Sequence, residues 1–469
     1  MSSQPEAPAL SPRDMARSGL CVGCGACAAA SGPSARMSLD AYGQFKPAGA
    51  WRKARDASLA SLCPFSPHAR DEDAIARLRF AQAPHHDGRL GRFEATYVGH
   101  AAEGQFRERG SSGGMATWTA HELLRLGLVD GVVHVAPQDR TLDGRFFAYT
   151  LSTSAEEVQA GAKSRYHPVE LSGVIEAIRA RSGRYAVVGV PCFIKAIHLL
   201  RARDEVLAGR IAFTLGLFCG HMKSTRMAES FAWQMGRAVT EVAALDYRAK
   251  DAARPANWYA AELQLADGRV ARKDWWGMVD GDWGAGFFQN AACDFCDDVV
   301  AETADISFGD AWVEPYSSDG RGTNVVVVRS HLLRNLVERA RCEGRLSLDP
   351  VDAEFVAQTQ AAGFRQRREG LALRLAETRG PIRPRKRVAP QSPPLSRRRR
   401  AIYHMRRRIA RWSHRVFWLA RLTRTPKIYL SWARLELAAY QGVTYSRGRV
   451  GAWADRYLFP NDEQDHSRK

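Results

Sequence analysis

Residues 21 to 34 read CVGCGACAAASGPS, with Cys21, Cys24 and Cys27 at a strict three-residue spacing. In bacterial ferredoxin runs of the form Cys-x2-Cys-x2-Cys-x3-Cys-Pro, the first three thiolates bind one 4Fe-4S cluster and the fourth cysteine serves another cluster. Ser31 stands where that fourth cysteine would be. The first cluster therefore needs a remote ligand, and SLCPFSP supplies a Cys-Pro pair at Cys63. The sequence predicts a 4Fe-4S site on Cys21, Cys24, Cys27 and Cys63.

A zinc site is the alternative for these four cysteines. Zinc motifs usually present their cysteines as separated pairs and not as a triple. The short spacers Gly23, Gly25 and Ala26 let the backbone wrap closely and direct N–H groups at the sulfurs. Both features favour the iron-sulfur cluster. Colour separates the two cases, since zinc thiolate sites are colourless.

Five cysteines remain, and four of them form a candidate second site. Cys293 and Cys296 make a Cys-x2-Cys pair in ACDFCDD, which needs two further thiolates. Cys192 and Cys219 each follow a predicted strand, and neighbouring parallel strands would bring them to one edge of a sheet. Each alone is equally typical of a buried structural cysteine, so the pattern leaves the second site open. Cys342, in a helical stretch, is expected to be structural.

Apolar periodicity predicts an α/β fold with a largely parallel sheet. Helices are expected over residues 116–128 and 169–181 and after Cys192. Strands are expected over 130–136, 185–190, 210–219, 304–310 and 323–330, and residues 258–276 are expected to form an antiparallel hairpin. A cluster module is predicted over residues 1–90, and residues 383–394 have the composition of a linker.

The bulk composition is that of a folded protein. The 469 residues are 45% hydrophobic and 25% charged, as in ordinary globular proteins. We find neither an apolar run of about 18 residues nor a secretory leader, so we expect a cytoplasmic protein. Nine cysteines in such a chain indicate metal ligation or redox chemistry more than disulfides.

The positive charge is concentrated in the last part of the chain. Residues 381–469 carry 22 Lys and Arg against 5 Asp and Glu, and hence +17 of the formal charge of +18. Within residues 397–422, RRRRAIYHMRRRIARWSHRVFWLARL, apolar residues recur every three or four positions, which predicts a basic amphipathic helix. The predicted stripe consists of Ile402, Met405, Ile409, Trp412, Val416 and Leu419.

Three interpretations of this basic helix stay open. It could lie on an anionic membrane at its inner face, with Trp412, Phe417 and Trp418 at the interface. It could instead dock on the folded body or on an acidic protein partner. Nucleic acid is the least favoured, because nothing in the chain resembles a base-reading module.

Residues 110–114, GSSGG, precede a predicted helix, where backbone N–H groups and serine hydroxyls can hold a phosphate. This signal is weak by itself. Together with RERGSSGG, GAKSRYHPVEL, VGVPCFIKAI, GLFCG, CDFCDD and ADISFGDAW, however, CVGCGAC resembles the family of coenzyme F420 hydrogenase/dehydrogenase beta subunits. The motifs occur in the family's order over about residues 18–345. The family includes chlorophyll-reducing relatives, such as hydroxymethyl-chlorophyll reductase and divinyl-chlorophyllide vinyl reductase.

The resemblance implies an iron-sulfur flavoprotein oxidoreductase. Its 4Fe-4S clusters would pass electrons between FAD and a low-potential partner such as ferredoxin or a deazaflavin. It implies an N-terminal ferredoxin-like module (1–90), an FAD-binding and iron-sulfur domain (91–380) and a basic linker with a helical tail (381–469). It also implies a second cluster on Cys192, Cys219, Cys293 and Cys296.

The resemblance further implies a set of cofactor-binding residues. Ser111, Ser112, Gly113 and Gly114 would contact the flavin or its phosphates. Ser164, Arg165 and Tyr166 stand at the family's Ser-Lys-Tyr-like segment, and Arg165 in place of lysine puts deazaflavin use in doubt. No general acid is identifiable. The alternative from a different class is a non-enzymatic zinc-thiolate adaptor whose tail binds a membrane or an acidic partner.

Overall fold

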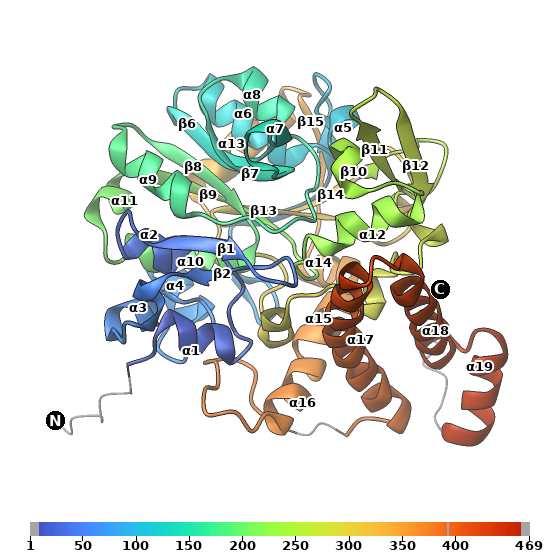
Figure 1. Cartoon of the computed structure of the whole chain (residues 1–469). Helices are drawn as coiled ribbons and strands as arrows, with labels where there is room; N and C mark the ends of the chain where they lie inside the picture. The colour runs from blue at the N-terminus through green and yellow to red at the C-terminus, as the bar shows by residue number, and fades with distance from the viewer. Residues whose placement is uncertain (1–8, 392–393, 461–469) are drawn as a thin grey trace.

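The computed structural model describes residues 9–391 and 394–460, which are organised around a central eight-stranded sheet (Figure 1). Most of its strands share one direction, and the predicted α/β fold class is confirmed. Across the sheet the strands are β15 (Leu346–Pro350), β5 (Ala95–Ala101), β14 (Asn324–Val328), β13 (Ile306–Asp310), β9 (Ile211–Leu217), β8 (Tyr185–Gly189), β6 (Gly131–Pro137) and β7 (Phe147–Ser152).

The parallel part of the sheet lies at its centre. Neighbouring strands β13, β9, β8 and β6 are parallel, and β5 points the same way. β14, β15 and β7 run in the opposite direction. The parallel centre matters for the site, because it brings the ends of β8 and β9 to one edge.

Helices cover both faces of the sheet, because successive strand residues point to opposite sides. Val132 of β6 faces a core formed with α6 (Met115–Arg125) and α13 (His331–Cys342). Val133 faces the opposite core, formed with α9 (Ser172–Ala180) and α10 (Pro191–Arg201). All five residues of β14, NVVVV, are buried, as expected of a strand covered on both faces.

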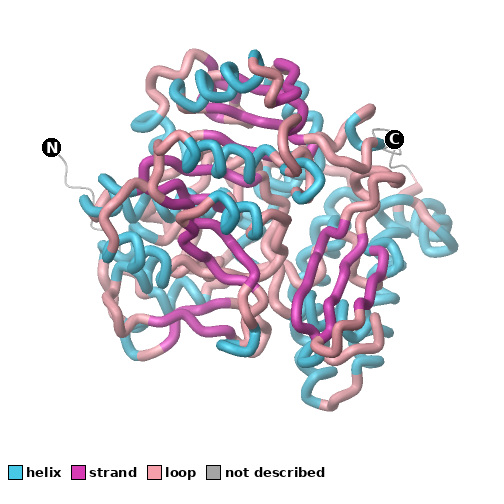
Figure 2. Tube along the Cα trace, turned by 90° about the horizontal axis from the view of Figure 1, so that it is seen from above, coloured by secondary structure: helices cyan, strands magenta, loops and turns pink. Residues whose placement is uncertain are grey.

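A separate three-stranded sheet flanks the main sheet (Figure 2). Its strands β11 (Ala260–Leu265) and β12 (Val270–Asp274) confirm the predicted antiparallel hairpin. A third strand, β10 (Val242–Ala249), pairs with β11 and was not predicted. The smaller helices of the body are α5 (Phe106–Arg109), α7 (Arg140–Asp143), α8 (Ala155–Ala160), α11 (Glu205–Arg210), α12 (Arg226–Gln234) and α14 (Ala353–Thr359).

The N-terminal segment packs directly on the body through α10. Its residues Met15 and Phe65 share one core with Phe193 of α10, and α10 packs against both α2 and α3. The cysteines of this segment are therefore held close to the central sheet. The elements are α1 (Pro12–Arg17), α2 (Ala26–Ala30), α3 (Ala57–Leu62), α4 (Glu72–Arg79) and the hairpins β1 (Arg36–Leu39)–β2 (Phe45–Ala48) and β3 (His85–Asp87)–β4 (Gly91–Phe93).

The C-terminal helices also dock on the body, at the lower right of Figure 1. The long helix α17 (Arg397–Leu422) stacks Phe417 on Trp233 of α12, with 4.3 Å between the ring centroids. Of the three interpretations of this helix, the structure shows docking on the body. The other helices of this part are α15 (Ala361–Arg367), α16 (Glu369–Glu377), α18 (Pro426–Tyr445) and α19 (Gly448–Trp453).

The buried face of α17 differs from the predicted stripe. Phe417, expected at a membrane interface, is fully buried, whereas Trp412 and Leu419 are 45% and 43% exposed. The docking surface turns the helix so that small and polar positions such as Ser413 also face inward: Ser413 Oγ accepts the N–H of Phe288 at 2.9 Å. No helix among the described residues is long and apolar enough to cross a membrane.

The predicted linker also departs from expectation. Lys386 Nζ donates to Asp297 Oδ1 at 3.0 Å, and the backbone N–H of Arg387 donates to Asp297 Oδ2 at 3.2 Å. The Lys386 and Asp297 side chains are 3% and 0% exposed. Composition suggested a free connection, but buried carboxylates fix this part of it against the body. We refer to residues 385–388 as the strap.

Candidate functional site

The four cysteines of the predicted N-terminal site line one cavity. Cys27 lies in the short helix α2, and Cys63 follows the last residue of α3. Gly23 and Gly25 adopt φ values of +83° and +80°, and a Cβ at Gly23 would lie 2.6 Å from the carbonyl oxygen of Phe45. Glycine is therefore required in these spacers, and the turns it permits direct the cysteines towards one another.

Burial disfavours the thiolate forms of the cysteines in this cavity. Burial, with repulsion from Cys21, raises the pKa of Cys63 to about 12. Burial likewise raises the pKa of Cys24, and repulsion from Cys63 adds to it. A thiolate is the form that binds metal, and a buried one forms only when a bound cation offsets the cost of burial.

The second predicted set of cysteines is brought together from three parts of the chain. Cys192 lies in the first turn of α10, directly after β8, and Cys219 follows β9, with its N–H donating to Val299 O at 3.0 Å. Cys293 and Cys296 lie in and after the 3-10 turn η5 (Ala291–Phe295). Burial raises the pKa of Cys192, as do the neighbouring thiols of Cys296, Cys219 and Cys293. The parallel pairing of β8 and β9 explains this convergence.

Two donors reach the sulfurs of the second set. The Met222 N–H donates to Cys293 Sγ at 3.3 Å, and Arg367 Nη1 donates to Cys296 Sγ at 2.9 Å. Burial acts to lower the pKa of Arg367, but the facing thiols of Cys296 and Cys219 outweigh it and hold that pKa above its usual value. Hydrogen bonds to cluster sulfurs are among the main determinants of cluster potential.

Helix α10 connects the two cysteine sets. It carries Cys192 at its start and Lys195 one turn later, where Lys195 Nζ pairs with Glu72 of α4 at 3.1 Å. Lys195 also acts to lower the pKa of Cys63, while Cys24 acts to raise the pKa of Cys192. The two sets are thus near neighbours in space.

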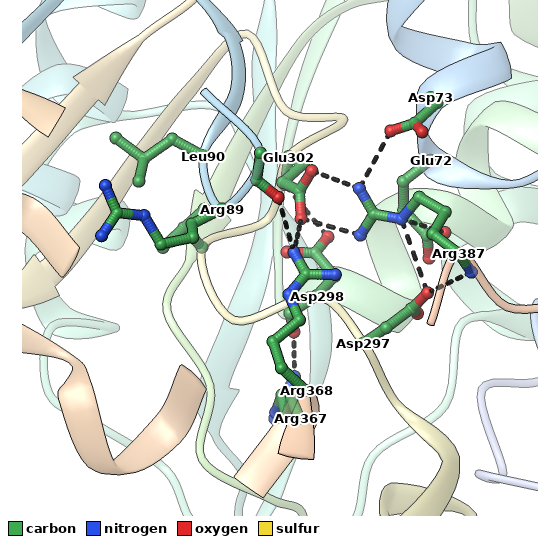
Figure 3. Close-up of polar contacts among 12 residues, drawn as sticks. Glu72, Asp73, Arg89, Leu90, Asp297, Asp298, Glu302, Arg367, Arg368 and Arg387 are labelled. Atoms are coloured by element: carbon green, nitrogen blue, oxygen red, sulfur yellow. Dashed lines mark hydrogen bonds and ion pairs between the residues drawn. The ribbon is translucent and has the colours of Figure 1, made fainter. Parts of the chain in front are cut away.

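Figure 3 shows a network of charged side chains that includes Glu72 of α4, Asp297 and Arg387 of the strap. Arg387 Nη2 bonds Glu302 Oε1 at 2.8 Å, and its Nε lies 3.5 Å from Asp297. Arg368 approaches Glu302 at 3.7 Å. Burial, with repulsion from Glu302, raises the pKa of Asp298 to about 7. The strap thus supplies cations to Asp297, which directly follows Cys296, and to Glu302 farther along the same loop.

Two of the predicted cofactor segments meet. Ser111 Oγ accepts the N–H of Ser164 at 2.8 Å, while Ser112 Oγ donates to Thr323 O at 3.0 Å. Gly113 and Gly114 open α6, and a Cβ at Gly113 would lie 2.8 Å from Asn324 N. Close packing inside the protein therefore explains both glycines, and Ser111 is the member of this loop that meets the second segment.

Positive charge surrounds this loop. Lys250 Nζ donates to the carbonyl oxygens of Ser112 at 2.8 Å and Arg321 at 2.7 Å. Burial and the nearby Lys163 and Arg248 lower the pKa of Lys250 to about 7. A half-buried cation of this kind is stabilised by a nearby anion.

An aromatic chain joins this region to the second cysteine set. Tyr166 packs on Trp283 with 4.8 Å between ring centroids, and Trp283 stacks on His221 at 4.4 Å. His221 immediately precedes Met222, which donates to Cys293. Arg165 lies to the side, with Nη2 donating to Ala162 O at 2.8 Å and its guanidinium 5.0 Å from the Phe147 ring.

Other residues beside the motifs have structural partners. His167 Nδ1 and the Tyr247 hydroxyl are 2.9 Å apart, and Asp310 pairs with Arg248 at 2.8 Å. Cys342, expected to be structural, is exposed at the end of α13. Within the part of the chain that the structure describes, no three His, Cys, Asp or Glu side chains are placed to hold a single metal ion.

Several residues of the site could not be identified from the sequence. Arg367 is one of three arginines in FRQRREG, and the preceding residues give no motif. Lys250 and Trp283 stand outside the matched motifs, and Lys386 lies in a segment with linker composition. Only the folded chain distinguishes these residues from their neighbours.

Comparison with known proteins matches this chain to two models of one family, coenzyme F420 hydrogenase/dehydrogenase, beta subunit. The model of the family's N-terminal part matches residues 96–176, and the model of its C-terminal part matches residues 182–354. The second cysteine set lies within the latter range. The N-terminal cysteines, Arg367 and the strap lie outside both ranges.

Individual proteins are also similar to this chain. Coenzyme F420 hydrogenase subunit beta of Methanosarcina barkeri is 22% identical over 280 residues, 57% of this chain and 85% of the relative. An uncharacterized protein of Methanocaldococcus jannaschii is 24% identical over 254 residues, 52% of this chain and 63% of that protein. A chain of the F420-reducing NiFe hydrogenase complex of Methanosarcina barkeri has a TM-score of 0.47 at 17% identity, covering 62% of this chain and 95% of that chain. This chain belongs to the coenzyme F420 hydrogenase/dehydrogenase beta subunit family.

Proposed function

We propose that this protein is an iron-sulfur flavoprotein oxidoreductase that passes electrons between a low-potential partner and FAD through two 4Fe-4S clusters. One observation carries the proposal: eight of the nine cysteines, all of them buried or half-buried, gather in two sets on either side of α10. Membership of a redox family supports it. The first set would be Cys21, Cys24, Cys27 and Cys63, and the second Cys192, Cys219, Cys293 and Cys296.

The chain's own residues position and tune the cofactors. When bound, the clusters supply single-electron transfer and FAD supplies two-electron exchange. The cysteines hold the clusters, and α10 fixes one set relative to the other. Met222 N–H and Arg367 donate to sulfurs of the second set, while Ser111 and Lys250 would orient the dinucleotide. The half-buried aromatic chain of Tyr166 and Trp283 would limit the access of water to the space between flavin and cluster.

The redox partner proposed is ferredoxin or a reduced deazaflavin. The Methanosarcina barkeri relative is named as one subunit of a coenzyme F420 hydrogenase, so a second redox protein is the partner class to test first. Arg165 keeps the positive charge of the family's lysine.

The test is an anaerobic spectrum with iron, acid-labile sulfide and FAD quantified per chain. About eight irons, four in each of two clusters, and one FAD are expected. Cys63→Ser should remove about half of the iron, whereas Cys342→Ser should remove none because Cys342 is exposed and belongs to neither set. Zinc without flavin would overturn the proposal and support the zinc-thiolate adaptor.

A second proposal concerns the outward face of α17, and one observation favours it. Trp418 and Leu422 are 43% and 66% exposed near the end of the helix, and Trp412 and Leu419 extend the same apolar area. Arginines precede these residues along the exposed face. Interfacial tryptophan beside arginine is typical of a surface that binds anionic lipid. We propose that this face lies on the inner surface of an anionic membrane.

A further inference from the structure

A buried arginine from beyond the family-matched range reaches the second cysteine set. Arg367 ends α15 and is 4% exposed. Its Nη1 donates to Cys296 Sγ at 2.9 Å and also to Asp298 O. Its Nη2 donates to Gly220 O at 2.7 Å and also to Cys219 O. Acceptors from two cysteine-bearing segments therefore fix the guanidinium in one orientation.

We propose that Arg367 raises the reduction potential of the iron-sulfur cluster held by Cys192, Cys219, Cys293 and Cys296. The inference rests on the proposed function, because it needs a cluster at this site. The step is the gain of one electron by the cluster, in which no bond forms or breaks. The added negative charge is stabilised by a fixed buried cation, because charges interact more strongly where water is excluded.

The chemistry of arginine suits this role. Its guanidinium stays charged at every pH that the protein survives, and its planar fork can bond several acceptors at once. The cluster therefore faces a constant positive charge, and no proton needs to accompany the electron. A hydrogen bond to a ligand sulfur adds to the effect by drawing electron density from the cluster.

The N-terminal set has a different environment. Lys46 Nζ donates to the carbonyl oxygen of Cys21 at 2.6 Å, and Lys195 is paired with Glu72. Lys46 and Lys195 thus bond a carbonyl oxygen and a carboxylate, whereas Arg367 donates a hydrogen bond to a cysteine sulfur. Loss of Arg367 should therefore change the potential of the second cluster and leave that of the N-terminal cluster unchanged. Arg367 is thus a positioning residue for the second cluster.

The experiment is a dithionite titration of the full-length holoprotein followed by EPR, with iron quantified first. Arg367→Gln should lower the midpoint potential of the second cluster at least by the equivalent of a tenfold change in the reduction equilibrium, 59 mV for one electron. Arg367→Lys, which keeps the charge, should show a smaller decrease. The N-terminal cluster should keep its potential in both variants.

Arg374→Gln is the matched control. Arg374 is also 4% exposed and donates through Nε to the carbonyl oxygen of Asp294 at 2.7 Å, on the same loop as Cys293 and Cys296. It tests whether loss of a buried arginine beside this loop is enough to change the potential. A shift in Arg374→Gln equal to that in Arg367→Gln, or no shift in Arg367→Gln, would overturn the inference.

A second measurement needs no variant, in case Arg367→Gln loses the cluster. Wild-type protein labelled with ¹⁵N-arginine should show a nitrogen coupling to the reduced second cluster in pulsed EPR. Absence of this coupling in iron-loaded protein would also overturn the inference. Wild-type protein without iron would instead refute the proposed function, so the two failures are distinguishable.

Discussion

Replacing Arg387 by methionine should release the strap from the body. Arg387 is the main partner of Glu302, whose side chain is 1% exposed, and it also lies 3.5 Å from Asp297, which is 0% exposed. Methionine keeps much of the side-chain volume but removes the charge. The variant therefore leaves a buried carboxylate without its closest cation.

The size of the effect follows from these contacts. Removing one partner of a buried ion pair costs about 3–5 kcal/mol. The lower value applies here, because Lys386 still pairs with Asp297 at 3.0 Å and Arg368 remains 3.7 Å from Glu302. At 1.36 kcal/mol for each tenfold change, about 3 kcal/mol corresponds to a roughly hundredfold increase in the population of the open strap.

Hydrogen exchange of the holoprotein measures this population. The Arg387 N–H is bonded to Asp297, so a peptide covering residues 383–391 should exchange about a hundredfold faster in Arg387→Met. Adding Glu302→Gln should recover much of the loss, since it removes the unpaired charge. Arg385→Met is the control: Arg385 is 60% exposed and its pair with Asp71 is worth about 1 kcal/mol or less. An acceleration in Arg387→Met no larger than in this control would refute the reasoning.

Two further predictions concern ligands. Lys250→Met should weaken FAD binding about tenfold or more in a flavin titration, with Lys273→Met on β12 as the control. The affinity of the wild type for FAD should fall as pH rises through about 7, because Lys250 loses its proton there. The affinity of Lys250→Met for FAD should depend less on pH. Equal FAD affinities of the two proteins at every pH would contradict the role of Lys250 in FAD binding. Trp418→Glu should release the protein from vesicles containing phosphatidylserine, whereas Trp258→Glu, at an equally exposed tryptophan (43%), should leave binding unchanged; retention of the Trp418 variant on vesicles would remove the membrane proposal.

The features that could be predicted from the sequence are those that depend on residues close together in the chain. Cysteine spacing and obligatory glycines are short-range features, so the sequence indicated the first candidate set, whereas the second set was implied by the family resemblance. Apolar periodicity likewise located α6, α9, α10 and the β11–β12 hairpin, because a covered sheet and its helices leave a regular pattern. Cys63 was predicted as the remote ligand because a ferredoxin-type run requires one, and it lines the same cavity as Cys21, Cys24 and Cys27.

The parts that could not be predicted depend on distant contacts. The rotation of α17 is set by Trp233 and Phe288, far away in the sequence, so Phe417 is buried and Trp412 is exposed. Ile402, Ile409 and Phe417 of α17 belong to the main core, so this helix is part of the folded body and not a separable tail. Arg367 and Lys386 look like surface residues in the sequence, because charged side chains are rarely buried without partners.

The continuous helix α10 also affects how turnover can be controlled. It spans 11 residues, holds Cys192 at one end and packs along its length against α2 and α3. At 1.5 Å per residue it is a stiff strut of about 16 Å, with no hinge between the two sets. For clusters held as proposed, this packing would keep the distance between them constant. Control of electron flow would then act where electrons enter the protein and where they leave it.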